Sequence, residues 1–181
     1  MKGIVFTEFL EMVEERFTPT VADQIIEAAA LASGGAYTAV GTYDHHELIQ
    51  LVVQLSTVTG IAGPELVRSF GEYLFGRFVV AYPHFFGNVP SAFAFLARVE
   101  HHIHSEVRKL YPDAELPTFY CDETVPDRLT LTYQSSRPFA DLAEGLITGC
   151  IQHFGEAIDV HKDDMSDGHK TWVRFVLTKR D

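Results

Sequence analysis

Apolar residues in the first part of the chain recur every three or four positions, which is the spacing of an amphipathic helix. The pattern predicts a helix that begins near Pro64, because proline is favoured at the first helical position, and Phe78 is expected at or beyond its end. Ser33-Gly34-Gly35 is expected to interrupt the chain between two helices. Three further helices are expected at residues 4–17, 21–31 and 44–56.

Asp44 stands at the start of the third of these helices and can cap it. Glu47, three residues later, is expected to complete a capping box. The adjacent pair His45-His46 then needs no further role, and we expect both side chains to be exposed.

Residues 129–137, LTLTYQSSR, alternate strictly instead. A strand has a period of two, so Leu129, Leu131, Tyr133, Ser135 and Arg137 are expected to point to one face. The face starts apolar and ends with two hydroxyls and a guanidinium, and an arginine facing a core is costly unless it meets an anion. These groups suit one ligand with several carboxylate or phosphate oxygens, such as a haem with its propionates. The alternative is an edge strand whose arginine extends into water while Tyr133 packs in the core.

Residues 91–111 predict a helix that carries three histidines. Ser91 is a suitable N-cap, Arg108 and Lys109 suit the C-terminal end, and Pro112 disfavours continuation beyond Tyr111. The main apolar stripe of this helix comprises Leu96, Val99, Ile103, Val107 and Leu110.

The three histidines take different angular positions on this helix. His101 lies roughly opposite the stripe and His102 lies on one flank. His104 lies on the other flank, in a narrower sector with Phe93, Ala97 and Tyr111 that suits a flat ligand. A neutral imidazole there could coordinate iron, while a satisfied surface histidine remains the alternative for each of the three.

The last part of the chain predicts a helix at 139–154 and a hairpin of two strands at 157–162 and 171–178. Cys150 falls on an apolar helix face and is expected to be a buried free thiol, whereas Cys121 lies between strand and loop candidates. Four residues near the hairpin turn could bind a metal weakly, but they fit a solvated turn better. They are His161, Asp163, Asp164 and His169.

Composition narrows the function classes. The net charge of −11 argues against nucleic acid as a partner, because its phosphates would be repelled. With 46% hydrophobic residues over 181 positions, a real core is expected. No apolar run reaches the length of a membrane span and the N-terminus does not resemble a signal peptide, so a cytoplasmic location without a membrane is the default expectation.

Four places along essentially the whole chain resemble haem nitric oxide/oxygen-binding domains, the H-NOX family, which also supplies the sensor of soluble guanylate cyclase. They are residues 1–5 with the apolar helix that begins there, residues 70–75, the segment from His104 to Leu116-Pro117, and the Tyr-x-Ser-x-Arg strand. The strand motif downstream of a His-x6-Tyr-Pro segment, in this order, is specific. The resemblance implies a stand-alone bacterial form.

The resemblance implies a site for haem b. His104, seven residues before Tyr111-Pro112, corresponds to the axial ligand of the iron. Pro117 matches a proline that presses on the porphyrin, and Val5 matches an aliphatic residue against the macrocycle. The implied propionate-binding residues are Tyr133, Ser135 and Arg137.

The implied fold is α+β, a single domain over 1–181. A helical distal lobe at about 1–63 and a proximal lobe at 64–181, with the His104 helix and a small antiparallel sheet, are expected to enclose the haem.

The resemblance also indicates which gas is bound. Oxygen-binding members have a tyrosine five residues after the motif arginine, where this chain has Leu142. Phe9 and Leu74 occupy the positions of residues that would orient such a tyrosine. With Phe78 and Leu146, the distal pocket is expected to be wholly apolar, which suits nitric oxide and CO and discriminates against oxygen.

The implied mechanism begins with nitric oxide weakening the bond between iron and His104. Release of the His104 helix would let the porphyrin relax against Pro117 and Val5, and the lobes would rotate. A histidine kinase or a cyclic-di-GMP enzyme is the expected partner, and the domain itself is not expected to be an enzyme. The alternatives are a haem enzyme of the peroxidase or dioxygenase type, which would need a distal acid, base or donor, and a haem-free interaction module.

Overall fold

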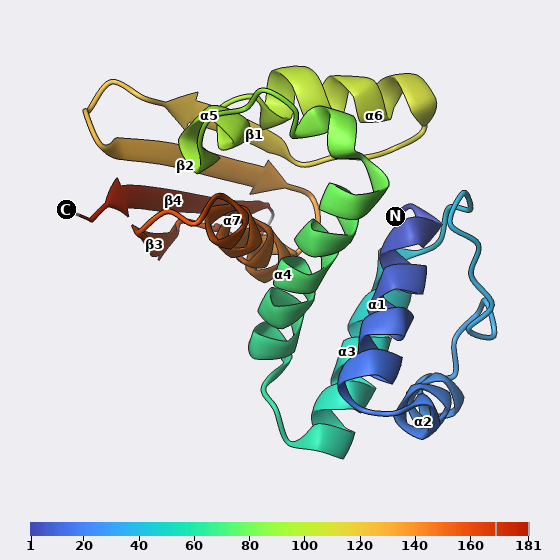
Figure 1. Cartoon of the computed structure of the whole chain (residues 1–181). Helices are drawn as coiled ribbons and strands as arrows, with labels where there is room; N and C mark the ends of the chain where they lie inside the picture. Colours follow the sequence, from blue (N-terminus) through green and yellow to red (C-terminus); the bar gives the residue numbers. More distant parts are fainter. Residues whose placement is uncertain (169, 181) are drawn as a thin grey trace.

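The computed structural model describes residues 1–168 and 170–180, with helices first and a sheet last (Figure 1). This confirms the expected α+β class. His169, one of the four residues considered as weak metal ligands, lies outside the described residues. The helices before the sheet are α1 Gly3–Arg16, α2 Pro19–Ala29, α3 His45–Thr59, α4 Gly63–Ala81, α5 Ala92–Leu96 and α6 His104–Leu110.

Four antiparallel strands form the sheet in the order β1-β2-β4-β3. Helix α7, Ala140–Phe154, comes after β2 and leads into the predicted β3–β4 hairpin, which is confirmed. The strands are β1 Thr118–Asp122, β2 Arg128–Ser135, β3 Ile158–Asp164 and β4 Thr171–Lys179.

Strand β1 was not predicted from the sequence. It lies at one edge of the sheet, and its second half is exposed. An edge strand with little burial has no clear alternation of apolar and polar residues. The structure identifies β1 as a strand by its pairing with β2, which the sequence pattern does not show. Cys121, which lies in this strand, is exposed.

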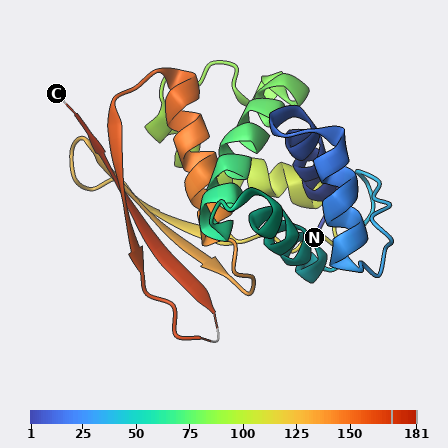
Figure 2. The ribbon, with the colours of Figure 1, turned by 90° about the horizontal axis from the view of Figure 1, so that it is seen from below.

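The elements are stacked in layers, seen from below in Figure 2: the sheet, then α7, then α4, then the first three helices. Helices α4 and α7 cross at very close range through Gly71 and Gly145. A Cβ added to Gly71 would lie 2.8 Å from the Cα of Gly145, so neither position can carry a side chain without moving the backbone.

Two apolar clusters fill the interior, and α4 contributes to both. Phe70 belongs to the cluster among α1, α2 and α3, whereas Phe75 belongs to the cluster against α7 and the sheet. Cys150 is a free, fully buried thiol in the second cluster, as expected. The division into lobes near residue 63 remains a prediction.

The start of α3 differs from the expected capping box. Asp44 does cap the helix, accepting the backbone N–H of His46 at 3.0 Å. The carboxylate of Glu47 instead accepts from Ser33 Oγ at 2.5 Å and from Tyr37 Oη at 2.7 Å, and Glu47 is buried. Both donors lie in the loop before α3, and a capping box considers only residues at the start of the helix itself. The capping-box prediction for Glu47 is therefore wrong.

The expected continuous helix at 91–111 is interrupted. Ser91 caps its start by accepting from Ala94 N at 3.2 Å, and α6 ends at Leu110 before Pro112 as predicted. Between α5 and α6, residues 99–103 form a π-helical turn. Such a turn contains more residues than an α-helical turn and rotates all later positions of the helix, so a 3.6-residue period does not hold across this segment.

Candidate functional site

One large cavity of about 580 Å³ is enclosed by α1, α4, the segment 99–117, β2 and α7. Its volume lies in the range of ligand sites in proteins, and most of its lining is apolar. Of the eleven residues that the family resemblance places at the haem or in its distal pocket, Phe9 does not line this cavity and the other ten do. The ten that line it are Val5, Leu74, Phe78, His104, Pro117, Tyr133, Ser135, Arg137, Leu142 and Leu146.

The three histidines of the 99–104 segment are separated by burial. His101 and His102 are exposed, whereas His104 is 9% exposed and faces the cavity. Burial lowers the pKa of His104, although the nearby Glu100 carboxylate opposes this shift. The imidazole is therefore neutral near pH 7, which is the state in which histidine binds a metal.

The hydrogen bonds of His104 determine which ring nitrogen is available. Its Nδ1 lies 3.1 Å from Oε2 of Glu100, four residues earlier. With Nδ1 donating to this carboxylate, Nε2 is the nitrogen left with a lone pair for a ligand.

The wall around His104 includes the main apolar stripe and, from the narrower sector, Tyr111. Leu96, Val99, Ile103, Val107 and Leu110 all line the cavity with His104. Phe93 and Ala97, expected beside His104, do not. Phe93 instead lies under Lys179, whose Nζ is 5.1 Å from the ring centroid. The π-helical turn accounts for the difference, since it rotates His104 onto the stripe.

The polar end of the cavity is formed by β2 and the residues after it. Leu131, Tyr133, Ser135 and Arg137 line the cavity together, as the alternation predicts. Ser135 Oγ accepts the backbone N–H of Arg137 at 3.0 Å. Burial raises the pKa of Tyr133, which is 3% exposed, so its hydroxyl stays protonated and can donate.

Arg137 brings a cation into the cavity rim, and its side chain is only 15% exposed. It pairs with the carboxylate of Glu115, which is itself 72% exposed. The pKa of His45 is lowered mainly by burial, then by the neighbouring His46 and then by the charge of Arg137. The pKa of the Met1 amine is lowered by burial first and by Arg137 second. Although the chain carries a net charge of −11, this end of the cavity therefore favours an anionic group.

Helices α1, α4 and α7 contribute an apolar part of the lining. Its five residues are Val5, Leu74, Phe78, Leu142 and Leu146. Phe9 does not belong to it, because that ring is fully buried against Phe70 with 5.2 Å between centroids. Tyr82, one turn beyond Phe78, also lines the cavity and carries a hydroxyl.

The polar cavity and support residues missed from the sequence include Glu100, Glu115, Tyr82 and His45. Glu100 could have been found, because residues four apart on a helix are neighbours. Nothing local indicates Glu115 or Tyr82. His45 lines the cavity and packs against Phe139, 6.1 Å between ring centroids, so the expectation that both histidines of the pair are exposed is wrong for His45 and correct for His46.

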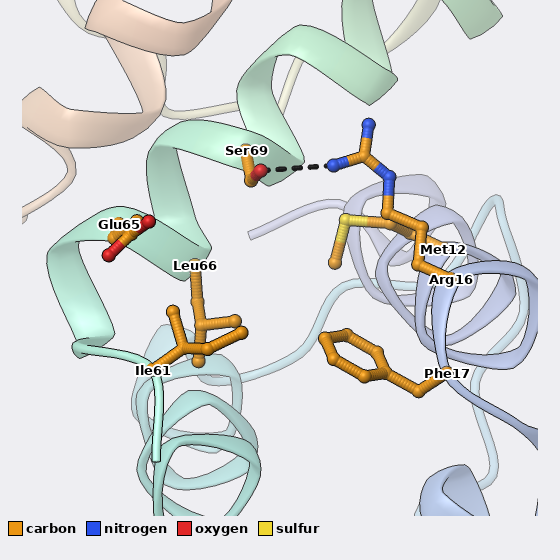
Figure 3. Close-up of a pocket in the computed structure, with 7 residues that line it drawn as sticks. All are labelled: Met12, Arg16, Phe17, Ile61, Glu65, Leu66 and Ser69. Atoms are coloured by element: carbon orange, nitrogen blue, oxygen red, sulfur yellow. Dashed lines mark hydrogen bonds between the residues drawn. The ribbon is translucent and has the colours of Figure 1, made fainter. Parts of the chain in front are cut away.

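A second cavity, of about 180 Å³, lies between the end of α1 and the start of α4 (Figure 3). Arg16 reaches across it and donates to Ser69 Oγ at 3.0 Å, as the dashed line in Figure 3 shows. None of the predicted site residues lines it.

The residues near the β3–β4 turn show local pairing. His161 Nε2 lies 2.9 Å from Asp163 Oδ1, and Asp163 also accepts from Arg174 at 2.9 Å. Because Asp163 is engaged by two side chains, the expectation of a solvated turn fits better than a metal site.

Comparison with known proteins adds an independent observation. A family model described as Haem-NO-binding matches residues 2–162. No curated protein sequence matches.

Solved structures are similar over the whole chain. The Fe(II) unliganded H-NOX protein from K. algicida is 38% identical, with a TM-score of 0.92 over 100% of this chain and 97% of that one. The IWP-051-bound H-NOX from Shewanella woodyi in the Fe(II)CO state is 42% identical, with a TM-score of 0.85 over 99% and 95%. The H-NOX protein from S. oneidensis in the Fe(II)NO state is 24% identical, with a TM-score of 0.91 over 100% of both chains, and shows the shared fold alone.

Proposed function

Because the chain belongs to the Haem-NO-binding, or H-NOX, family, we propose that it senses nitric oxide through haem b, also binds CO, and excludes oxygen. H-NOX proteins bind haem and act as gas sensors rather than enzymes. The observation that carries the finer proposal is one cavity that is lined by a buried neutral histidine, by five hydrocarbon side chains from α1, α4 and α7, and by a tyrosine, a serine and an arginine.

The residues present fit a haem. A flat, mostly apolar ring system matches the lining, and two propionates match the polar end. In this proposal Arg137, Ser135 and Tyr133 hold the propionates, with Arg137 exchanging Glu115 for the ligand, since the exposed Glu115 is free to move into water. Pro117 and Val5 contact the macrocycle.

His104 would supply a ligand to the haem iron through Nε2, because Nδ1 is held by Glu100. Ferrous haem iron supplies the atom that binds a diatomic gas. The hydrocarbon side chains of Leu74, Phe78, Leu142 and Leu146 would exclude water from the gas and offer it no hydrogen bond. Bound oxygen depends on such a donor far more than nitric oxide or CO does, and selectivity follows from this wall.

Signalling requires that the gas shift an equilibrium between two conformations. We propose that the lobes at about 1–63 and 64–181 move relative to one another when the bond to His104 weakens. Asp113, just beyond α6, accepts from Thr42 at 2.9 Å and pairs with Lys2 at 3.2 Å, so the His104 segment is tied directly to the first lobe.

The family role as a sensor implies a partner, which we propose is a histidine kinase or a cyclic-di-GMP enzyme in the cytoplasm. In the described ranges, no helix is both long and apolar enough to cross a membrane.

The test is the visible spectrum of the protein expressed with haem available. After reduction, a high-spin ferrous band should stay unchanged in air and shift with nitric oxide and with CO. A stable oxy spectrum would contradict oxygen exclusion. A colourless protein that folds without cofactor would contradict the site itself.

A further inference from the structure

Glu100 is held more firmly than a helix-surface carboxylate. Its side chain is 17% exposed. Oε2 lies 3.1 Å from His104 Nδ1 and accepts the backbone N–H of Phe119 at 3.1 Å, while Oε1 accepts from Arg108 at 3.0 Å. Glu100 lies in the π-helical turn, and groups from α6 and β1 therefore fix both oxygens of its carboxylate.

Such a contact has two physical consequences for an imidazole. A carboxylate that accepts from Nδ1–H fixes the tautomer and the ring orientation, so Nε2 keeps its lone pair in a set direction. It also draws the proton on Nδ1 toward itself, which makes Nε2 a stronger electron donor to a metal. Neither consequence applies to His101 or His102, which are exposed and have no carboxylate on their ring nitrogens in the described contacts.

We propose that Glu100 is a positioning residue that strengthens the bond between His104 and haem iron. The inference rests on the proposed function, because it requires His104 to be the axial ligand. Its consequence is regulatory: the stronger this bond, the more the binding of a gas on the opposite side must contribute before His104 is released. Glu100 would therefore set the sensitivity of the switch.

Arg108 has the opposite influence. Its guanidinium withdraws negative charge from Oε1 and so weakens the pull of the carboxylate on the Nδ1 proton. Arg108 is 44% exposed, so solvent reduces this effect but does not remove it. Substituting Glu100 and substituting Arg108 should therefore change the iron–histidine bond in opposite directions, which a purely structural role would not do.

The first experiment is resonance Raman spectroscopy of the reduced haem protein together with its Fe(III)/Fe(II) potential. Glu100→Gln keeps the size of the side chain and removes its charge. We expect the iron–histidine stretch to move to lower wavenumber, the potential to become more positive, and a larger share of the nitric oxide complex to lack the histidine. Haem transfer to an acceptor protein should be about 10- to 100-fold faster. Arg108→Gln should shift the stretch and the potential the other way.

Glu106→Gln is the matched control. Glu106 lies on α6 with His104, is 38% exposed and pairs with Lys109 at 2.6 Å rather than with the ring. It should leave the stretch and the potential unchanged. If Glu100→Gln also leaves both unchanged at full haem content, the proposal is wrong.

A second experiment covers the case in which Glu100→Gln does not retain haem. His104→Gly protein is supplied with imidazole or with 1-methylimidazole, which has no N–H to donate. The difference in iron–nitrogen stretch between the two ligands should be larger in His104→Gly than in His104→Gly/Glu100→Gln. Equal differences would overturn the role of Glu100. If instead His104→Gly retains the wild-type histidine spectrum, the assignment of the axial ligand fails, which is a failure of the proposed function and not of the Glu100 inference alone.

Discussion

Two walls of the same cavity are built in contrasting ways. The His104 wall couples the imidazole to a carboxylate, a guanidinium and a backbone N–H within one hydrogen-bonded cluster. The wall formed by Leu74, Phe78, Leu142 and Leu146 has only hydrocarbon side chains. In the proposed function, the first arrangement would tune a metal–ligand bond through charge, whereas the second would act by withholding hydrogen bonds. The proposal therefore predicts that signal strength and gas selectivity can be changed independently.

The largest expected effect comes from removing the ring on the first wall. His104→Gly should lose the protein-borne axial ligand and with it the five-coordinate histidine spectrum of the reduced protein, because no other described histidine in this segment faces the cavity. Visible and Raman spectra of the reduced protein measure this. His102→Gly, an exposed position in the same segment, is the control and should keep the wild-type spectrum. A wild-type spectrum in His104→Gly would mean that another residue binds the iron.

A smaller change adds a donor to the second wall. Leu142→Tyr should hold oxygen on the reduced protein for longer than Leu142→Phe, which has nearly the same size but no hydroxyl. A hydrogen bond to a charged group contributes about 1.5–3 kcal/mol, so oxygen should dissociate about 10- to 100-fold more slowly than from the phenylalanine variant. Stopped-flow measurement of oxygen dissociation compares the two. Equal rates would show that Leu142 does not face the bound gas.

The smallest effect concerns the contact that joins the His104 segment to the first lobe. Hydrogen bonds from Thr42 and Lys2 lower the pKa of Asp113 below its usual 3.8. This contribution to stability is therefore present above pH 3.8 and is lost as the pH falls through the lowered pKa. In the Asp113→Asn variant, the free energy of unfolding should fall less than in the wild type when the pH drops below 3.8.

Denaturant titrations at several pH values measure this change. Asp122→Asn is the control, because the pKa of Asp122 is also lowered but its backbone partner, Thr124, is local to its own loop. The control should leave the nitric oxide response unchanged, whereas Asp113→Asn should make the lobes easier to move. An identical gas response in both variants would contradict the proposed lobe contact.

Features set by local spacing were predictable from the sequence, and features set by distant partners were not. The alternation of β2 places Leu131, Tyr133, Ser135 and Arg137 on one face, and the structure has them there. Helix periodicity alone left three histidines open, and only the family resemblance selected His104. The π-helical turn explains why. A single helical period cannot give the direction of the histidine side chains that lie in or after this turn.

The errors have the same origin. Glu47 was assigned to its own helix terminus but bonds to Ser33 and Tyr37, fourteen and ten residues away in the chain. Strand β1 is defined by its pairing with β2, and His45 is half-buried because Phe139 packs beside it. These partners come from other elements, and pattern rules applied to one segment cannot find them.

The contact between Gly71 and Gly145 has a consequence for how this protein can diverge. The two helices that carry Leu74, Phe78, Leu142 and Leu146 meet backbone to backbone, so their separation does not depend on the side chains that face the cavity. Those side chains can be exchanged while the frame that carries them keeps its dimensions. A single substitution among these side chains can therefore reshape the lining of the cavity while the two helices keep their separation.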